Sequence, residues 1–279
     1  MNKEKVNLGL IQETLLITLW ARAIEASKDD PIIKDTKSVE ILAQIDYDFA
    51  KLNKAKRTQV GVCLRSLAFD RWVCDYLRQN PHDTFVEIGA GLNTRFERVD
   101  NGQVRWFDLD LPDAIALRKQ FFQETDRRKF IAASVLDPSW IDVVKASSNG
   151  PVMFAAEGVL IYLTESQVKQ VFAMLAEHFP GALLAFDSLS PYRVKHQNQH
   201  DAIKHFEARF QWGIEDIHDI QMWNPLYKIL EIERYQDAPL KYLLRMGLIN
   251  SLMLSIPPLR NIYRYSLVKL GSDMPVPPS

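Results

Sequence analysis

The sequence has few cysteines, no excess of basic residues and no long apolar run. Cys63 and Cys74 lie eleven positions apart in one predicted helix, which places them about 16 Å apart, beyond the reach of a disulfide. The formal net charge of −1 gives no basic field for nucleic acid. No apolar run reaches the roughly 18–20 residues of a membrane span, and acids near the N-terminus are unlike a secretory signal. We therefore expect reduced thiols, no nucleic-acid or membrane partner, and a cytoplasmic location.

Several patterns of known chemistry are also missing. The sequence contains no internal repeat, no G-x-S-x-G nucleophile elbow and no Walker pattern. His196 and His200 have the i,i+4 spacing of a zinc helix, but Gln197 stands where the H-E-x-x-H motif has its general base. We therefore predict no metal site.

What remains is the pattern of an α/β protein. The length of 279 residues, with 47% hydrophobic and 25% charged residues, suits one large globular domain with a cap. Strands are predicted at 84–88, 104–108, 130–136, 151–156 and 181–186, and helices at 57–79, 110–124, 137–146 and 164–179. Such alternation indicates a parallel sheet that is covered by helices on both faces.

The predicted organisation has five parts. They are an N-terminal helical cap at 1–56 with helices at 13–27 and 35–51, a cofactor-binding core at 57–190, a lid insertion at 191–226 with a helix at 201–210, a C-terminal part of the sheet at 227–270, and a disordered tail at 271–279. The fourth part is expected to hold strands at 229–235 and 260–270 and a helix at 240–254. Five aromatic residues near the lid could line a flat acceptor: Tyr192, Phe206, Phe210, Trp212 and Trp223.

The stretch 84–95, TFVEIGAGLNTR, reads as a buried strand that runs into a glycine turn. Gly89 and Gly91 would let a ligand lie against bare backbone at the carboxyl end of the strand. Glu87 lies inside the apolar run, where a carboxylate needs partners. Thr94 stands where the dinucleotide fingerprint has its third glycine. An ordinary strand–turn–helix corner is the alternative interpretation.

Acidic residues follow two further strands at the same edge of the sheet. Asp108 and Asp110 come 17 and 19 residues after Gly91, where a carboxylate can accept both ribose hydroxyls of an adenosine ligand. Glu157 follows the strand at 151–156 and could face a cationic ligand group. The alternatives are helix capping by Asp110 and by Glu157. Arg95 could pair with Glu87 or Asp108.

Three blocks in order, EIGAGLNTRFERV, WFDLDLP and FAAEGVLIYLTESQV, resemble the leucine carboxyl methyltransferase family. The resemblance is strongest to its bacterial polyketide-synthesis O-methyltransferase branch, and ETLLITLWARAIEA and DPIIKDTKSVEIL extend it over 12–190. It implies a class I methyltransferase that uses S-adenosyl-L-methionine, with a Rossmann-like, mostly parallel seven-stranded sheet whose last strand is antiparallel.

The resemblance also implies cofactor-binding roles for individual residues. Gly89 and Gly91 would flank the methionine part, Asp110 would take the ribose, Glu157 would face the amino group and Arg65 would hold the carboxylate. From spacing alone, Arg65 could equally be a solvated helix residue.

The adenine contact is less direct, because Ser134 stands where relatives carry an acid. This contact would then pass to Val135, the backbone or Asp137. Glu87 and Asp108 complete the predicted cofactor-binding set.

We expect methyl transfer to an oxygen of a small molecule, with a carboxylate acceptor and a methyl ester product. A carboxylate is already ionised at neutral pH, so it needs a cation, Arg65 or Arg193, rather than a base. The rival acceptor is a phenol that His196 or His200 deprotonates. Other hypotheses are a nicotinamide-dependent oxidoreductase and a non-catalytic partner-binding domain. The sequence does not fix the oligomeric state.

Overall fold

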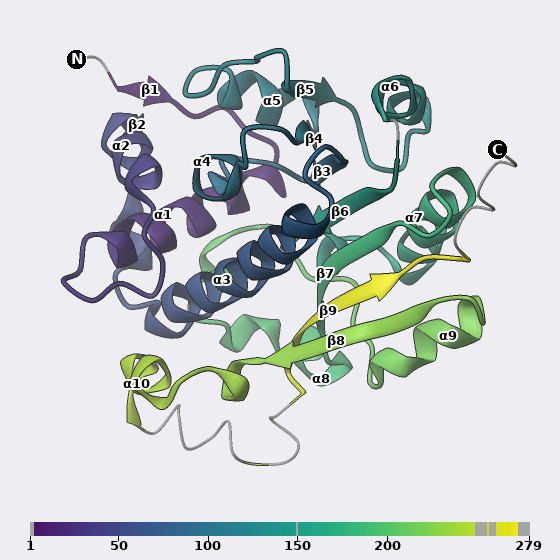
Figure 1. Ribbon diagram of the computed structural model, residues 1–279. Helices are drawn as coiled ribbons and strands as arrows, with labels where there is room; N and C mark the ends of the chain where they lie inside the picture. Colours follow the sequence, from purple (N-terminus) through teal and green to yellow (C-terminus); the bar gives the residue numbers. More distant parts are fainter. Residues whose placement is uncertain (1–2, 149, 249–255, 257–260, 273–279) are drawn as a thin grey trace, which may run out of the picture.

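The computed structural model, which describes residues 3–148, 150–248, 256 and 261–272, is built on one seven-stranded sheet (Figure 1). Its strands are β3 (Thr84–Ile88), β4 (Arg105–Asp110), β5 (Arg128–Ala132), β6 (Val152–Ala156), β7 (Leu183–Leu189), β8 (Lys228–Arg234) and β9 (Tyr263–Lys269). They lie in the order β5-β4-β3-β6-β7-β9-β8, parallel from β5 to β7, with β9 antiparallel to both of its neighbours. The predicted α/β fold, including the antiparallel last strand, is confirmed.

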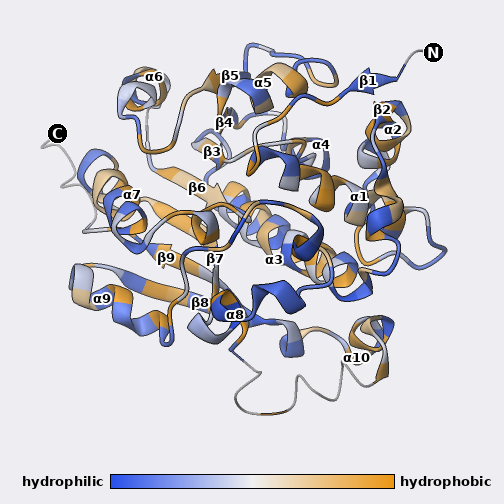
Figure 2. Ribbon diagram, turned by 180° about the vertical axis from the view of Figure 1, so that it is seen from behind, coloured by the Kyte–Doolittle hydropathy of each residue, from blue (hydrophilic) through white to orange (hydrophobic). Residues whose placement is uncertain are grey.

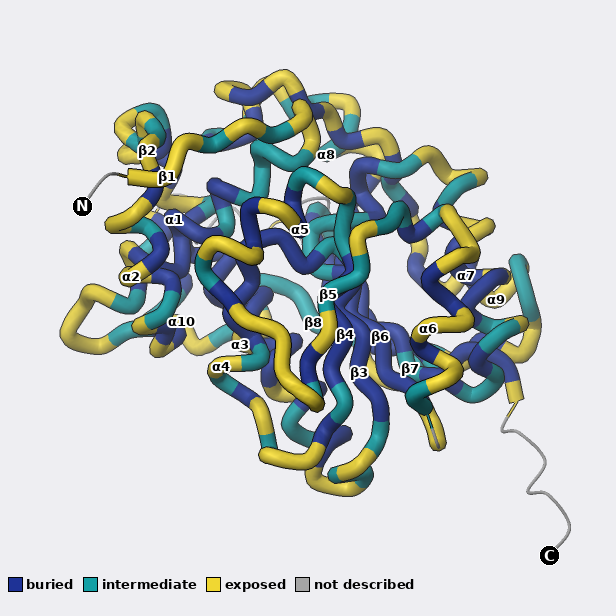
Figure 3. The backbone as a smooth tube through the Cα atoms, turned by 90° about the horizontal axis from the view of Figure 1, so that it is seen from above, coloured by how far each residue is buried: buried dark blue, intermediate teal, exposed yellow. Residues whose placement is uncertain are grey.

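The sheet separates two apolar cores because successive side chains of a strand point to opposite faces. Phe85 and Met153 belong to one core, and their neighbours Val86 and Phe154 belong to the other. The central strands are buried along their whole length (Figure 3). Figure 2, coloured by hydropathy, shows the wholly apolar β6 in orange, whereas the surrounding helices carry both colours.

Helices cover both faces of the sheet. The first core lies under α3 (Lys56–Gln79) and α4 (Arg95–Val99), and the second under α6 (Ser139–Ser147) and α7 (Glu165–His178). The helix α7 begins with the predicted capping box of Thr164 and Gln167. The helix α5 (Pro112–Arg118) is shorter than the predicted helix at 110–124.

The helix α3 is the longest in the described ranges and carries both cysteines, which are free thiols. Its predicted apolar stripe, from Leu64 to Tyr76, is buried, whereas Leu67, which the pattern also assigned to the stripe, is 41% exposed. No helix in the described ranges is long and apolar enough to cross a bilayer.

The N-terminal residues form a layer beside α3 (Figure 1). It contains β1 (Glu4–Lys5), α1 (Leu15–Ala26), α2 (Thr36–Gln44) and β2 (Ile45–Asp46), with β1 and β2 paired in parallel. The predicted helix at 35–51 is therefore too long. It ends at Gln44 because the next two residues pair with β1, and Asp48 then caps a separate 3-10 turn.

Of two helices predicted in the C-terminal half, the one at 201–210 is wrong and the one at 240–254 is confirmed in part. Only Ile203–His205 forms a 3-10 turn within 201–210, because the Asp201 carboxylate caps α3 and the Gln197 side chain binds the backbone of Phe210. The predicted helix at 240–254 is α10 (Leu240–Leu243) and a 3-10 turn, and 249–254 lie outside the described residues. The segment 191–226 also holds α8 (Pro191–Lys195) and α9 (Ile220–Trp223).

The packing of β6 yields a stability prediction. Phe154 is fully buried and lies edge-on against Trp140 and Phe179. Phe154→Ala should lower the free energy of unfolding by about 3–5 kcal/mol, because it leaves a cavity in the second core. Val143→Ala is the control, because Val143 is 49% exposed and the change should cost about 0.5 kcal/mol or less. Urea denaturation followed by circular dichroism measures both, and equal midpoints for the two variants would contradict this packing.

Candidate active site

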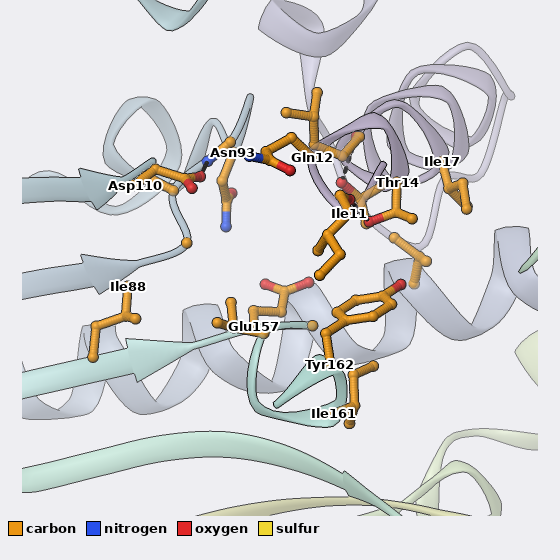
Figure 4. A pocket seen from close by; sticks show the side chains of 18 of the residues that line it. Ile11, Gln12, Thr14, Ile17, Ile88, Asn93, Asp110, Glu157, Ile161 and Tyr162 are labelled. Carbon is orange, nitrogen blue, oxygen red and sulfur yellow. Dashed lines mark hydrogen bonds between the residues drawn. The ribbon is translucent and has the colours of Figure 1, made fainter. Parts of the chain in front are cut away.

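A cavity lies at the carboxyl ends of β3, β4 and β6. These strands flank the point where the strand order reverses, which is where open α/β sheets bind ligands. Figure 4 shows Glu157 between Asp110 and Asn93 on one side and Tyr162 on the other. The cavity therefore has an end near β4, a middle around Glu157 and a second end near Tyr162.

The turn after β3 shapes the first end. Gly89 has a φ of +66°, and a Cβ there would lie 2.2 Å from Cγ2 of Val159. Glycine is therefore required both by the backbone and by this close approach. Arg118 fixes the turn by donating from Nη1 to the carbonyl oxygens of Gly91 and Asn93 at 2.8 and 3.0 Å.

Asp110 lines the cavity beside this turn. Its Oδ2 accepts the N–H of Gly91 at 2.6 Å and its Oδ1 accepts the N–H of Leu111 at 2.7 Å. Burial raises the pKa of Asp110 to about 6, although these hydrogen bonds oppose the shift. Each oxygen keeps a further lone pair, so the carboxylate can still accept two ribose hydroxyls.

Asp108 does not line the cavity, which corrects its predicted ribose role. It is buried, and its oxygens accept hydrogen bonds from Trp106 Nε1 at 3.0 Å and Arg128 Nε at 2.8 Å. Arg118 Nη2 lies 3.0 Å from Oδ2. Burial alone would raise the pKa of Asp108, but Arg118 and Arg128 outweigh it and hold that pKa below its ordinary value. Asp108 is a structural ion-pair partner.

Glu157 lies in the middle of the cavity wall. Its Oε1 accepts from Arg65 Nε at 2.9 Å and from Ser66 Oγ at 2.8 Å, and its Oε2 accepts from Arg95 Nη2. Burial alone would raise the pKa of Glu157, but Arg65, Arg95 and Arg22 lower it to about 2. The cavity therefore presents a permanent negative charge at this point.

Two arginines beside Glu157 use only some of their donors in hydrogen bonds to other described residues. Arg22, on α1, donates to Asp35 and to the carbonyl of Leu92, and Arg65 donates to Glu157 and Asp187. Both line the cavity. Within the described part of the chain, Arg22 Nη1 and Arg65 Nη2 have no hydrogen-bond partner. Paired with Glu157, they fit a zwitterionic amino-acid group.

Glu87 is buried behind the cavity rather than in its wall. It pairs with Arg95 and accepts from Asn93 Nδ2 at 3.1 Å, so the predicted Arg95–Glu87 pair is confirmed. Burial raises the pKa of Glu87 to about 7, although Arg95 opposes the shift. Direct cofactor contact by Glu87 is not supported by this placement.

Of the three residues predicted to contact the adenine, two line the cavity and one does not. Ser134 and Val135 line the cavity, because the chain leaves the sheet at Ala132 instead of continuing the predicted strand to 136. Asp137 does not line it, and its Oδ1 instead accepts the N–H of Ser139 at 2.9 Å, where α6 begins. The predicted contact by Asp137 is therefore not supported.

The second end of the cavity is mainly apolar, with a few hydroxyl groups and one imidazole. Its lining includes Thr58, Val62, Ile161, Tyr162, His200, Ile203, Phe210, Tyr235 and Tyr263. Burial raises the pKa values of Tyr162 and Tyr235 to about 12 and raises that of Tyr263 further. Burial and the nearby Arg193 lower the pKa of His200 to about 3. None of these four side chains titrates near neutral pH.

The remaining candidates in 191–226 lie outside the cavity wall. His196 stacks on Tyr192, with ring centroids 4.2 Å apart. Arg193 is half-buried, close enough to His200 and Tyr235 to affect their pKa values. Of the five predicted acceptor-lining aromatics, only Phe210 lines the cavity. The others pack elsewhere, as Trp212 does against Phe186 and Trp223.

An N-terminal strap, residues 9–14, closes the site from a direction that the sequence did not indicate. Ile11, Gln12 and Thr14 line the cavity (Figure 4). Gly9 N and Gln12 Nε2 donate to the carboxylate of Asp113 on α5, at 2.8 and 3.0 Å. No local motif marks the strap, and Arg22 was visible only as a polar residue within an apolar helix.

Comparison with known proteins agrees with this geometry. The family whose pattern matches this chain, over residues 15–176, is described as leucine carboxyl methyltransferase. The tetracenomycin polyketide synthesis O-methyltransferase TcmP of Streptomyces glaucescens is 30% identical over 237 residues, 85% of this chain and 87% of that protein. The S-adenosyl-L-methionine-dependent methyltransferase dpfgK of Gibberella zeae is 26% identical over 252 residues, 83% of this chain and 84% of that protein.

Solved structures support the fold alone. A protein of Thermobifida fusca YX described as a methyltransferase superposes with a TM-score of 0.57 at 15% identity, covering 92% of this chain and 95% of that one. A duf574 family protein of Streptomyces avermitilis gives 0.58 at 15% identity, with 90% and 97% covered. The sequence matches exclude the oxidoreductase and non-catalytic hypotheses. The chain belongs to the leucine carboxyl methyltransferase family and is a methyltransferase that depends on S-adenosyl-L-methionine.

Proposed function

We propose that this enzyme methylates a carboxylate oxygen of a small, largely apolar acceptor and releases a methyl ester. The observation that carries the proposal is the pKa pattern at the second end of the cavity. His200, with a pKa of about 3, and Tyr162 and Tyr235, with pKa values of about 12, are poor bases for a phenol at neutral pH. A carboxylate needs no base, because it is ionised already.

The proposed cofactor contacts follow the polar groups along the cavity. Asp110 accepts the ribose hydroxyls, Ser134 and Val135 lie against the adenine, and Glu157 faces the amino group. Arg22 Nη1 and Arg65 Nη2 donate to the carboxylate of the cofactor's methionine part. The cofactor would supply a methyl group that is bound to a sulfonium sulfur. When the methyl group moves to the acceptor oxygen, the sulfonium would become a neutral thioether. The protein's task is then to orient the acceptor and exclude water.

The acceptor end suits a flat apolar acid. Ile161, Ile203 and Phe210 give apolar walls, and Arg193 and Arg65 contribute positive charge nearby. In this proposal the segment 191–226 acts as the acceptor lid. The name of the TcmP relative, a polyketide synthesis O-methyltransferase, further supports an oxygen acceptor and a polyketide-like substrate.

Replacement of Asp110 tests the cofactor orientation. Asp110→Ala should weaken binding of S-adenosylhomocysteine by about 1–3 kcal/mol, since two ligand hydroxyls lose a charged acceptor. Asp137→Ala is the matched control and should bind as wild type does, because Asp137 lies outside the cavity wall. Titration calorimetry gives both affinities, with thermal unfolding as a check that the glycine turn survives. Wild-type affinity in Asp110→Ala would refute the ribose assignment.

The chemistry of the product tests the acceptor class. The enzyme should transfer labelled methyl groups to aromatic acids and not to phenols of the same ring size. Treating the products with mild base should release the label as methanol, because esters hydrolyse under conditions that leave aryl methyl ethers intact. A base-stable labelled product would show that a phenol is the acceptor.

A further inference from the structure

His200 is the one nitrogen base in the described lining of the acceptor end, and its hydrogen bonds reveal its tautomer. Its Nδ1 lies 3.2 Å from the N–H of Ala202 and 3.3 Å from the N–H of Ile203. A backbone N–H can only donate, so Nδ1 must accept and carries no proton. In a neutral imidazole the proton is then on Nε2.

The groups around His200 keep the ring neutral. Arg193 on α8 and Arg57 on α3 are the positive neighbours, and Asp201 is the negative one. Asp201 Oδ1 lies 3.5 Å from Nδ1 and would favour a protonated ring. However, Oδ1 already accepts the hydroxyl of Thr58 at 2.5 Å, and Oδ2 accepts the N–H of Arg57 at 3.0 Å. Burial and the two arginines lower the pKa of His200 more than Asp201 raises it.

The position of the ring is fixed as well as its tautomer. Phe210 meets the imidazole edge-on, with ring centroids 5.7 Å apart at 64°. Asp201 is anchored to the start of α3 by the N–H groups of Arg57 and Thr58, so the lid residue next to His200 is held on a rigid helix. Within the described ranges, Nε2 has no hydrogen-bond partner in the protein.

We propose that His200 binds the acceptor by donating its Nε2–H to the oxygen that is not methylated, and that it does not act as a base. This inference rests on the proposed carboxylate acceptor. A carboxylate has two oxygens, so one can accept this hydrogen bond while the other receives the methyl group. No proton is transferred, and His200 is the same species before and after the reaction.

The tautomer can be measured without turnover. In ¹⁵N-histidine-labelled enzyme saturated with S-adenosylhomocysteine, His200 is assigned by its loss in His200→Gln. We expect Nε2 protonated, Nδ1 unprotonated and no titration between pH 5 and pH 8, with added free histidine as the reference. A proton on Nδ1, or titration in this range, would overturn the proposal. The readout does not depend on which acceptor is natural.

The hydrogen bond can be tested with 1-naphthoate and 1-naphthol, which share one ring system. In the S-adenosylhomocysteine complex, His200→Ala should bind 1-naphthoate about 10- to 100-fold more weakly than wild type, whereas His200→Gln, which keeps a donor, should stay within about threefold. Cofactor affinity should be unchanged in both variants. Unchanged naphthoate affinity in His200→Ala, or equal wild-type affinity for the two probes, would refute the proposal. Tighter binding of 1-naphthol than of 1-naphthoate by the wild type would instead count against the carboxylate acceptor of the proposed function.

Discussion

The ion pairs of Glu157 with Arg65 and Arg95 set the character of the whole site, because they keep one buried carboxylate ionised in the cavity wall. They belong to a continuous buried cluster in which four arginines pair with five acids: Arg22, Arg65, Arg95, Arg98, Asp35, Asp70, Glu87, Glu157 and Asp187. Such pairs add little net stability, since desolvation offsets their attraction. The cluster holds one acid more than it holds arginines. Burial is the main cause of the raised pKa of Glu87, and the nearby Glu157 adds to it. A ligand of net positive charge, as S-adenosylmethionine is, would compensate the extra acid.

The cluster also joins segments that are distant in the sequence. Arg22 and Asp35 come from the N-terminal layer, Arg65 from α3, Arg95 from α4 and Asp187 from β7. The Tyr263 hydroxyl on β9 extends the cluster to Asp187 and Arg65. Because these partners hold one another, the cofactor end of the cavity is rigid. The acceptor end is built differently, from the strap, the segment 191–226 and a wall of apolar and aromatic side chains.

The sequence predicted those parts that local patterns determine. Seven strands, the glycine turn and the positions of Asp110, Glu157 and Arg65 follow from apolar runs, strand ends and motif blocks. Local patterns could not show which of Asp108 and Asp110 faces the cavity. Only the structure shows that Asp108 is already paired with the buried Arg118 and Arg128. The prediction of a helix at 201–210 is wrong because of another tertiary contact. The Asp201 carboxylate caps the N-terminus of α3 instead of capping a helix in its own segment. The strap and the tautomer of His200 likewise depend on tertiary contacts that no local pattern records.

The central claim is that the ionised Glu157 provides the charge that holds the cofactor, and its replacement tests this claim most directly. In Glu157→Gln, titration calorimetry should show S-adenosylmethionine binding at least about tenfold weaker than in wild type. Glu87→Gln, which changes a carboxylate behind the cavity wall, is the matched control and should lose less affinity. Both variants must unfold cooperatively for the comparison to hold. Wild-type affinity in a folded Glu157→Gln enzyme would contradict the account.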